Sequence, residues 1–218
     1  MKKLLVIMMS LSLFACSKND DRMKEKAAIE SESSTASQLR VENENLANKA
    51  EKMEKDLAKK NRFYQALKGT YEGTMTTNLG TTKVSIDFSP SKSIFPVTRV
   101  RQLEEIASDL NELFLTAHVV QSDPNNPNAA VGCAGIRVVD DIPKGELTIS
   151  SATCPNLYKI KVTERGFSAS VAENEETASR VARDVLAGYL DEVDSVNGEI
   201  KSTTYAGKVK FTANKIAE

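Results

Sequence analysis

The spacing of apolar residues divides the chain into three consecutive patterns. A short apolar run behind two lysines occupies residues 4–13, and apolar residues then recur every three or four positions from 36 to 67. From about residue 70 onward, apolar and polar residues alternate instead. A period near 3.5 is typical of a helix with one apolar stripe, whereas alternation is typical of strands with one buried face. The patterns predict a long N-terminal helix followed by a mainly β domain.

The middle segment has a heptad repeat. It contains no glycine or proline before Gly69, which suits a long exposed helix that ends at or just before that glycine. Thr35 and Gln38 have the spacing of a capping box, so we expect the helix to begin near residue 36. The a and d positions form a narrow seam, which comprises Leu39, Asn43, Leu46, Ala50, Met53, Leu57, Tyr64 and Leu67.

Two interpretations of this seam stay open. Asn43 at an a position fixes register in parallel dimers, and Lys49 could attract Glu54 across such a dimer, which favours a homo-oligomer through the stalk. Lys60 at a d position and the small Ala50 weaken the seam. The other interpretation is a single helix that packs its stripe on the protein's own domain, or a solvated stalk.

The last 150 residues read as short strands. Residues 70–77 and 82–88 alternate around Asn78-Leu79-Gly80, as in a hairpin. The C-terminal stretch SVNGEIKSTTYAGKVKFTANK reads as two strands broken at Ala206-Gly207, and further candidates are ELFLTAHVV, GELTISSATC and YKIKVTERGFSASV, the last with a turn at Glu164-Arg165-Gly166. We count seven or eight strands, which predicts an antiparallel barrel or sandwich.

Two segments of this domain have helical spacing. Residues 177–193 carry apolar residues with a 3.6 period, which predicts one amphipathic helix that covers an end of the sheet. Residues 99–113 read equally as a helix, through Leu103, Ile106 and Leu110, or as a strand followed by a turn. The fold class is therefore mainly β, preceded by a long N-terminal helix or coiled coil.

The first sixteen residues have the order of a secretory signal. Lys2 and Lys3 precede the apolar run, and the small Ala15 precedes Cys16. The run is shorter than the roughly 20 residues that a membrane-spanning helix needs. We expect four segments: a signal peptide at 1–15, a polar tether at 16–35, the helical stalk at 36–68 and the β-rich domain at 69–218.

The sequence Leu13-Phe14-Ala15-Cys16 resembles the lipobox of bacterial lipoproteins. The resemblance implies that a signal peptidase cuts before Cys16, whose thiol and new amino group then carry acyl chains such as palmitate. Several acyl chains, at about 0.8 kcal/mol per buried CH₂, would hold the protein on a bilayer without a spanning helix. The alternative is an ordinary secreted protein with a stray cysteine.

The residue after the cysteine bears on localisation. In lipoproteins an aspartate at that position often signals retention in the inner membrane, whereas this chain has Ser17. In a host with two membranes, the resemblance implies the outer membrane, on its periplasmic or outer face.

The order of lipobox, polar linker and heptad helix is similar to that of murein lipoproteins, over the first third of the chain. Those proteins end in a lysine that is linked to peptidoglycan, whereas this sequence ends in Lys215-Ile216-Ala217-Glu218. Covalent attachment to the cell wall is therefore not implied.

Two cysteines remain once Cys16 is assigned to acylation. Cys133 and Cys154 both lie in the exported part, where an oxidising compartment favours a disulfide worth about 3 kcal/mol. A zinc site is the alternative, but each cysteine is solitary and His118 is the only histidine. Structural zinc sites need paired ligand spacing, so we expect a disulfide and no metal.

Composition removes some function classes. The 29 basic and 30 acidic side chains give a net charge of −1, so no field of one sign attracts nucleic acid. The chain is 40% apolar and 27% charged, as in ordinary globular proteins. We expect no nucleic-acid partner and no cofactor.

The sequence contains no familiar catalytic set. His118 lies in an expected strand without a serine motif, and we interpret it as structural. In the loop 121–132, Asp123, Asn125, Asn126 and Asn128 offer oxygen ligands for Ca²⁺, but the terminal acidic residue of an EF-hand loop is missing, so a surface turn is expected. Asp140 and Asp141 beside Pro143 read as another turn.

Three function classes remain. The favoured one is a non-enzymatic envelope protein in which acyl chains anchor, the helix spaces or oligomerises, and the β domain binds an envelope protein or a cell-wall component. The second is a carrier of a small apolar ligand inside a β-barrel. The third is a hydrolase whose carboxylates meet only in the fold.

Overall fold

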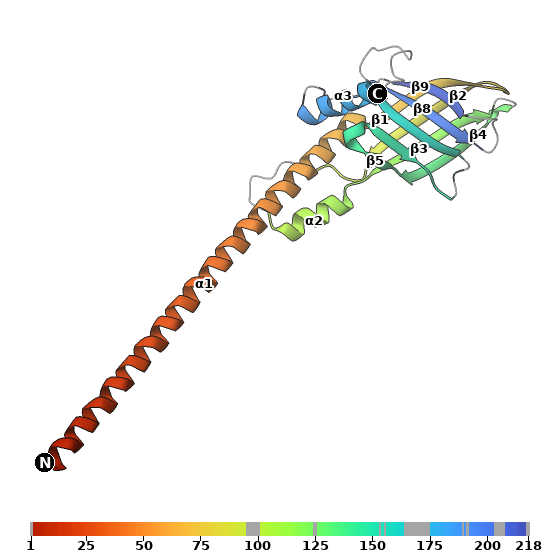
Figure 1. Cartoon of the computed structure of the whole chain (residues 1–218). Helices are drawn as coiled ribbons and strands as arrows, with labels where there is room; N and C mark the ends of the chain where they lie inside the picture. The colour runs from red at the N-terminus through yellow and green to blue at the C-terminus, as the bar shows by residue number, and fades with distance from the viewer. Residues whose placement is uncertain are drawn as a thin grey trace. The chain divides into compact units, whose positions relative to one another are not determined.

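The computed structural model describes residues 2–94, 101–123, 126–152, 154, 156–163, 175–188, 190, 192–202 and 208–216 (Figure 1). Its contacts divide the chain into two compact units, Met1–Glu51 and Lys52–Glu218. The first unit is entirely helical in the part described, and the second contains the end of the helix and the whole sheet.

Helix α1 runs from Lys2 to Leu67, well beyond the start that the sequence predicted. Residues 16–35, the expected tether, are helical, and Thr35 lies inside the helix, so the capping box is wrong. The physical reason is that no glycine or proline interrupts the chain before Gly69. The predicted end is confirmed: the Lys68 amide donates to the Tyr64 carbonyl at 3.0 Å, and Gly69 has a φ of 124°. No helix in the described ranges is long and apolar enough to cross a membrane.

The described part of the second unit forms one antiparallel sheet of nine strands. The strands are β1 (Gly69–Thr77), β2 (Gly80–Pro90), β3 (Leu115–Asp123), β4 (Asn126–Arg137), β5 (Val139–Asp141), β6 (Glu146–Ile149), β7 (Asn156–Thr163), β8 (Ser195–Ser202) and β9 (Lys208–Lys215). Their order is β4-β3-β2-β1-β9-β8-β7-β6-β5. Among the described strands, those that follow each other in sequence are paired, as in a meander, except β4 and β5.

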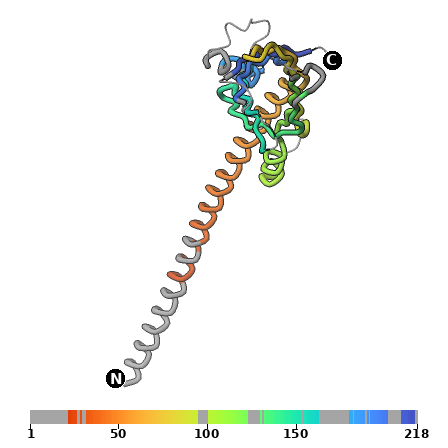
Figure 2. Tube along the Cα trace, turned by 90° about the vertical axis from the view of Figure 1, so that its right-hand side faces the viewer, coloured from red at the N-terminus to blue at the C-terminus, as the bar shows by residue number. Residues whose placement is uncertain are grey.

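The sheet curves round until it is nearly closed and barrel-like (Figure 2). The first and last strands pair, with Tyr71 opposite Lys215. The two outermost strands, β4 and β5, are separated in sequence only by Val138. Residues 126–141 thus pair with β3 through their first part and with β6 through their last. The prediction of a β domain with a barrel or sandwich is met by a barrel-like sheet.

The described strands number nine where the sequence predicted seven or eight. Strand β4 begins at Asn126, inside the segment 121–132 that was expected to be a surface turn, and that expectation is wrong for most of its length. Pairing continues there because β4 lies at one end of the strand order, where Pro127 can be accommodated without breaking a central ladder. Strand β5 has only three residues, too few for an alternating pattern.

Alternation along the strands sets the inner face of the sheet. On β2, Val84, Ile86 and Phe88 are buried while the residues between them are more exposed. Glycine makes room where a large neighbour fills the interior: a Cβ on Gly198 would lie 2.2 Å from the Phe211 ring. The core is therefore packed by aromatic and branched side chains drawn from all parts of the sheet.

The domain carries two further helices and one short 3₁₀ turn. The sequence left the segment 99–113 open, and over its described residues, 101–113, the structure has helix α2 (Leu103–Glu112). Helix α3 (Glu175–Ala187) confirms the amphipathic helix but ends before the predicted residue 193. It stops because Gly188 has a φ of 84° and its amide donates to the Val185 carbonyl at 3.1 Å. The 3₁₀ turn η1 (Ile142–Lys144) follows β5 and packs against α3.

The last turns of α1 belong to the core of the second unit. Phe63, Tyr64 and Leu67 are fully buried. The backbone joins them to the start of β8, since the Val193 amide donates to the Ala66 carbonyl at 3.0 Å. The Tyr71 hydroxyl donates to the Val193 carbonyl at 2.7 Å, and burial raises the pKa of that phenol. The end of α1 is thus an integral part of the β domain.

Candidate functional site

Cys133 and Cys154 form a disulfide, as the sequence predicted, with their Cα atoms 5.4 Å apart. Cys133 lies on β4, and Cys154 lies between β6 and β7. Strand β4 stands at one end of the strand order, and β6 and β7 stand near the other end. The disulfide therefore connects the two ends of the described sheet, which no backbone pairing joins directly. Because the two sulfur atoms are bonded to each other, neither thiolate is available as a zinc ligand.

A polar trio made of Gln121, Asn156 and Tyr158 lies beside this disulfide. Cys154 precedes Asn156 by two residues, and Cys133 pairs with Val119, two residues before Gln121. The Asn156 side-chain amide donates to Gln121 Oε1 and to the Tyr158 hydroxyl, both at 3.2 Å. Gln121 is on β3 and Asn156 on β7, which are not neighbours, so their hydrogen bond spans the inside of the curved sheet.

The trio is buried but incompletely paired. Gln121, Asn156 and Tyr158 are 2%, 5% and 1% exposed. Asn156 Oδ1 is buried and has no hydrogen-bond partner among the residues that the structure describes. Sequence reasoning missed the trio because Gln121 was placed in a loop. The available signal was the alternation that puts Asn156 and Tyr158 on the same face as the apolar Ile160 and Val162.

The heptad seam divides into an exposed part and a buried part. In the first unit Leu39 and Leu46 are 55% and 46% exposed, and Asn43 is exposed as well. Ala50 and Met53 are intermediate, whereas Leu57, Tyr64 and Leu67 are fully buried. Lys60, the weak d position, lies with Nζ 5.5 Å from the centre of the Tyr64 ring. The interpretation of a helix packed on its own domain therefore holds for residues 57–67.

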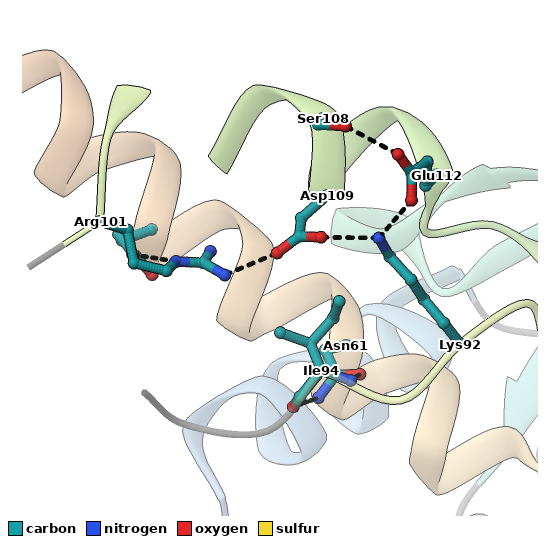
Figure 3. A network of polar contacts seen from close by, with 8 residues as sticks. Asn61, Lys92, Ile94, Arg101, Ser108, Asp109 and Glu112 are labelled. Atoms are coloured by element: carbon teal, nitrogen blue, oxygen red, sulfur yellow. Dashed lines mark hydrogen bonds and ion pairs between the residues drawn. The ribbon is translucent and has the colours of Figure 1, made fainter. Parts of the chain in front are cut away.

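A charged cluster ties the end of α1 to α2 (Figure 3). Arg101 Nε donates to Glu54 Oε1 at 2.7 Å, and Arg101 Nη1 donates to Asp109 Oδ2 at 2.6 Å. Lys92 Nζ donates to Asp109 Oδ1 at 2.6 Å and to Glu112 Oε2 at 2.8 Å. Glu54, which the sequence assigned to an interchain contact with Lys49, is thus engaged within its own chain.

The electrostatics of this cluster favour the charged forms of its members. Hydrogen bonding to Lys92, followed by that to Arg101, lowers the pKa of Asp109 although partial burial opposes the shift. The same carboxylate raises the pKa of Lys92, and Glu54 raises the pKa of Arg101. A neighbouring contact adds to this clamp, because Asn61 on α1 donates to and accepts from the backbone of Ile94 at 2.9 and 3.1 Å.

Other residues singled out by the sequence have ordinary surroundings. His118 is exposed on β3, opposite Asp87, which confirms the expected strand. Asp141 pairs with Lys144 at 2.9 Å around η1, and the expected turn is confirmed there. Asp140 accepts a hydrogen bond from Tyr64, and burial, with that bond, raises the pKa of the phenol.

Some predicted sites lie outside what the structure describes. These are the side chain of Cys16, the turn at 164–166, and the possible Ca²⁺ ligands Asp123, Asn125, Asn126 and Asn128. In the described ranges, no group of three or more His, Cys, Asp or Glu side chains is arranged to hold a metal ion.

Comparison with protein-family models, with curated proteins and with solved structures finds no match for this chain.

Proposed function

We propose that this chain is a lipid-anchored protein of the bacterial cell envelope. In this proposal, acyl chains on Cys16 insert into the outer membrane, and α1 holds the β domain away from the membrane surface. The β domain then binds an envelope protein or a cell-wall component. The lipobox-like Leu13-Phe14-Ala15-Cys16 motivates the anchor. The β domain is proposed to act by binding, without chemistry of its own.

The observation that carries this proposal is the way α1 ends. A passive tether needs no fixed attachment, yet the last turns of α1 are buried in the domain core. The Glu54–Arg101 pair and the Asn61–Ile94 contacts add a polar clamp on the same turns. These contacts make the last turns of α1 part of the folded domain, as suits a domain that is carried on a helix.

The exposed part of the seam supports a second role for α1. Leu39 and Leu46 are large apolar side chains left in solvent in the single chain. We propose that they contact a second copy of α1, which leaves the homo-oligomer limited to residues upstream of Leu57. From residue 36 to residue 56 this stretch covers only about three heptads, so the association is expected to be weak.

The anchor is tested by metabolic labelling with an alkyne analogue of palmitate, followed by membrane fractionation and mass measurement of the N-terminus. We expect label on the wild-type chain in outer-membrane fractions and none on Cys16→Ser. An unlabelled wild-type chain with an intact Met1 would remove the anchor from the proposal.

The binding role is tested by crosslinking in membranes and identification of captured partners. A deletion of residues 36–49 removes two heptads without touching the buried residues from Leu57 onward. We expect partners of the β domain to survive this deletion. If they are lost with it, the partner binds the helix and the assignment of binding to the domain is wrong.

A second candidate function is the carrier of a small apolar ligand inside the barrel. The observation that favours it is the buried, unpaired Asn156 Oδ1 on the largely apolar inner face of the sheet. Barrels of about eight strands have an interior that side chains fill or that holds one small ligand, and the sheet here has nine strands. Mass spectrometry of the folded protein under native conditions tests this function, because a carrier is expected to retain a small molecule through purification.

A hydrolase gains no support from the acidic residues that the fold brings together. Asp109 and Glu112 share Lys92, and Asp109 also binds Arg101. These contacts keep Asp109 and Glu112 charged, whereas a general acid needs a raised pKa. We therefore assign the cluster to structure.

A further inference from the structure

We propose that two copies of α1 pair in parallel and in register over residues 36–53, so that Asn43 of one chain lies against Asn43 of the other. The pairing rests on the homo-oligomer proposed above and adds its orientation, its register and both of its ends. The contacts come from one exposed face of the helix.

The face that pairs is exposed along this part of α1. Leu39, Asn43 and Leu46 are spaced by four and three residues, so they lie on one side of a helix. The two leucines are 55% and 46% exposed, and Asn43 is exposed as well. The same heptad seam continues into Leu57, which is fully buried. A repeat of 3.5 residues is the pattern of helices that wind around each other, so a second copy of the same seam fits the uncovered part.

Asn43 determines the orientation of the pair. In a parallel pair in register, each seam residue faces its own counterpart, and the amide of one Asn43 donates to the side-chain oxygen of the other. An antiparallel pair of the same stretch sets residue 36 against residue 53 and Asn43 against Leu46. Both asparagine amides would then lie against leucine without a hydrogen bond. Each such loss is expected to weaken the pair about 5-fold or more.

Charge favours the opposite orientation, but more weakly. The antiparallel pair would bring Glu42 of each copy near Lys49 of the other, and both side chains are exposed. Exposed ion pairs on helices strengthen an association by about 2-fold each, because water and salt screen them. The two asparagine hydrogen bonds therefore outweigh the two ion pairs, and the parallel orientation is favoured.

Two features set the ends of the pair. Upstream, the next d position is Glu32, which is exposed, and the parallel register would place two carboxylates against each other. Downstream, Leu57 is already buried, and Glu54 accepts a hydrogen bond from Arg101 of its own chain at 2.7 Å. Glu54 is therefore not open to Lys49 of the second copy, so the pairing ends at residue 53.

The parallel orientation agrees with the proposed anchor. It places the N-terminal ends of both chains at the same end of the pair, as two Cys16 residues acylated in one membrane require. Both chains then enter their β domains from the other end. Anchoring and dimerisation therefore support each other, because chains that stand on one bilayer meet in this orientation.

The test is disulfide crosslinking of the purified full chain. Cys16→Ser leaves the added cysteine as the only free thiol beside the Cys133–Cys154 disulfide. Leu39→Cys places it on the proposed seam, and Val41→Cys is the matched control, because Val41 is 59% exposed but two residues further round the helix. A disulfide needs Cβ atoms about 4 Å apart, so we expect Leu39→Cys to form covalent dimers about 10-fold faster than Val41→Cys.

A mixture of two variants reports the antiparallel pair. Leu39→Cys mixed with Ala50→Cys should form a heterodimer only if the helices run in opposite directions, because that alignment sets residue 39 against residue 50. In the chain with native Asn43, we expect this heterodimer to form no faster than the covalent dimers of the Val41→Cys control. Adding Asn43→Leu removes the amide, so the heterodimer should rise about 5-fold above that level.

The outcomes separate the orientation from the homo-oligomer. With native Asn43, a heterodimer of Leu39→Cys and Ala50→Cys that forms faster than the Leu39→Cys homodimer overturns the parallel pair and leaves the homo-oligomer standing. No rise with Asn43→Leu overturns the role given to Asn43. If no variant crosslinks above the control and sedimentation of the Cys16→Ser chain finds only monomer, the homo-oligomer fails and this pairing with it. If sedimentation finds a dimer that none of these variants crosslinks, the copies meet elsewhere and the proposed pairing is wrong.

Discussion

Arg101 Nε donates to Glu54 Oε1 at 2.7 Å, which joins the segment before α2 to α1 across 47 residues of sequence. The Arg101 side chain is only 7% exposed, so its charge depends on Glu54 and Asp109 for compensation. The pair fixes where the helix is attached to its domain.

Replacing Arg101 by methionine should lower the free energy of unfolding by about 1 to 2 kcal/mol, less than for a deeply buried pair because both carboxylates are partly exposed. The measurement is urea unfolding of the disulfide-intact protein. Lys144→Met is the matched control, since it removes an exposed ion pair with Asp141 and should cost under about 0.5 kcal/mol. Equal effects of the two changes would show that Arg101 is not a clamp.

The same cluster predicts a dependence of stability on acid pH. The pKa of Asp109 is lowered in the folded state from an ordinary value of 3.8. Its contribution is therefore fully present above pH 4 and is lost as the pH falls through the lowered folded pKa. Asp109→Asn should be less stable than wild type at pH 6, and the difference should shrink toward pH 2. Urea midpoints between pH 2 and 6 measure this, and a difference that does not change with pH would contradict it.

The disulfide should contribute about 3 kcal/mol to stability. The double change Cys133→Ser and Cys154→Ser is expected to lower the urea midpoint, and wild type in dithiothreitol should behave alike. Cys16→Ser serves as the control and should leave the midpoint unchanged. Detection of two free thiols in the unfolded, unreduced wild type would contradict the bond.

The exposed and the buried parts of the heptad seam should respond differently when their leucines are replaced by alanine. Leu57→Ala removes a fully buried side chain and should cost about 2 to 5 kcal/mol in urea unfolding. Leu39→Ala together with Leu46→Ala should change the unfolding of the β domain by under about 0.5 kcal/mol, because both side chains are exposed.

The sedimentation coefficient at several protein concentrations then tests self-association through the exposed part of the heptad seam. If wild type forms dimers, the Leu39→Ala and Leu46→Ala double variant should sediment as a monomer under the same conditions. A wild type that is monomeric at all concentrations would remove the homo-oligomer from the proposal.

Features specified by neighbouring residues could be predicted from the sequence. The hairpin around Gly80, the end of the helix before Gly69 and the amphipathic α3 all follow from local spacing and from glycine. Errors arose where a local signal was overruled. Thr35 looked like a cap but lies inside an uninterrupted helix, and the residues rich in Asn and Pro after Gln121 extend a strand because β3 supplies a pairing partner.

The sites were harder to predict because their residues meet only in the fold. Cys133 and Cys154 were paired from a count of cysteines and an expected compartment, which is independent of topology. Gln121 and Asn156 are 35 residues apart, and their contact needs β3 and β7 to face each other across the sheet. No periodicity in one strand carries that information, since it depends on how the whole sheet curves.

The pairing of Tyr71 with Lys215 has a consequence for the order of events in biogenesis. The first strand of the sheet is among the first parts of the domain to be made, and its partner is the last. Until β9 emerges, β1 has an unsatisfied edge that another chain could pair with. The two halves of the sheet therefore cannot be joined until β9 is made, and a chain truncated before β9 should be recovered in aggregates and not as a smaller soluble domain.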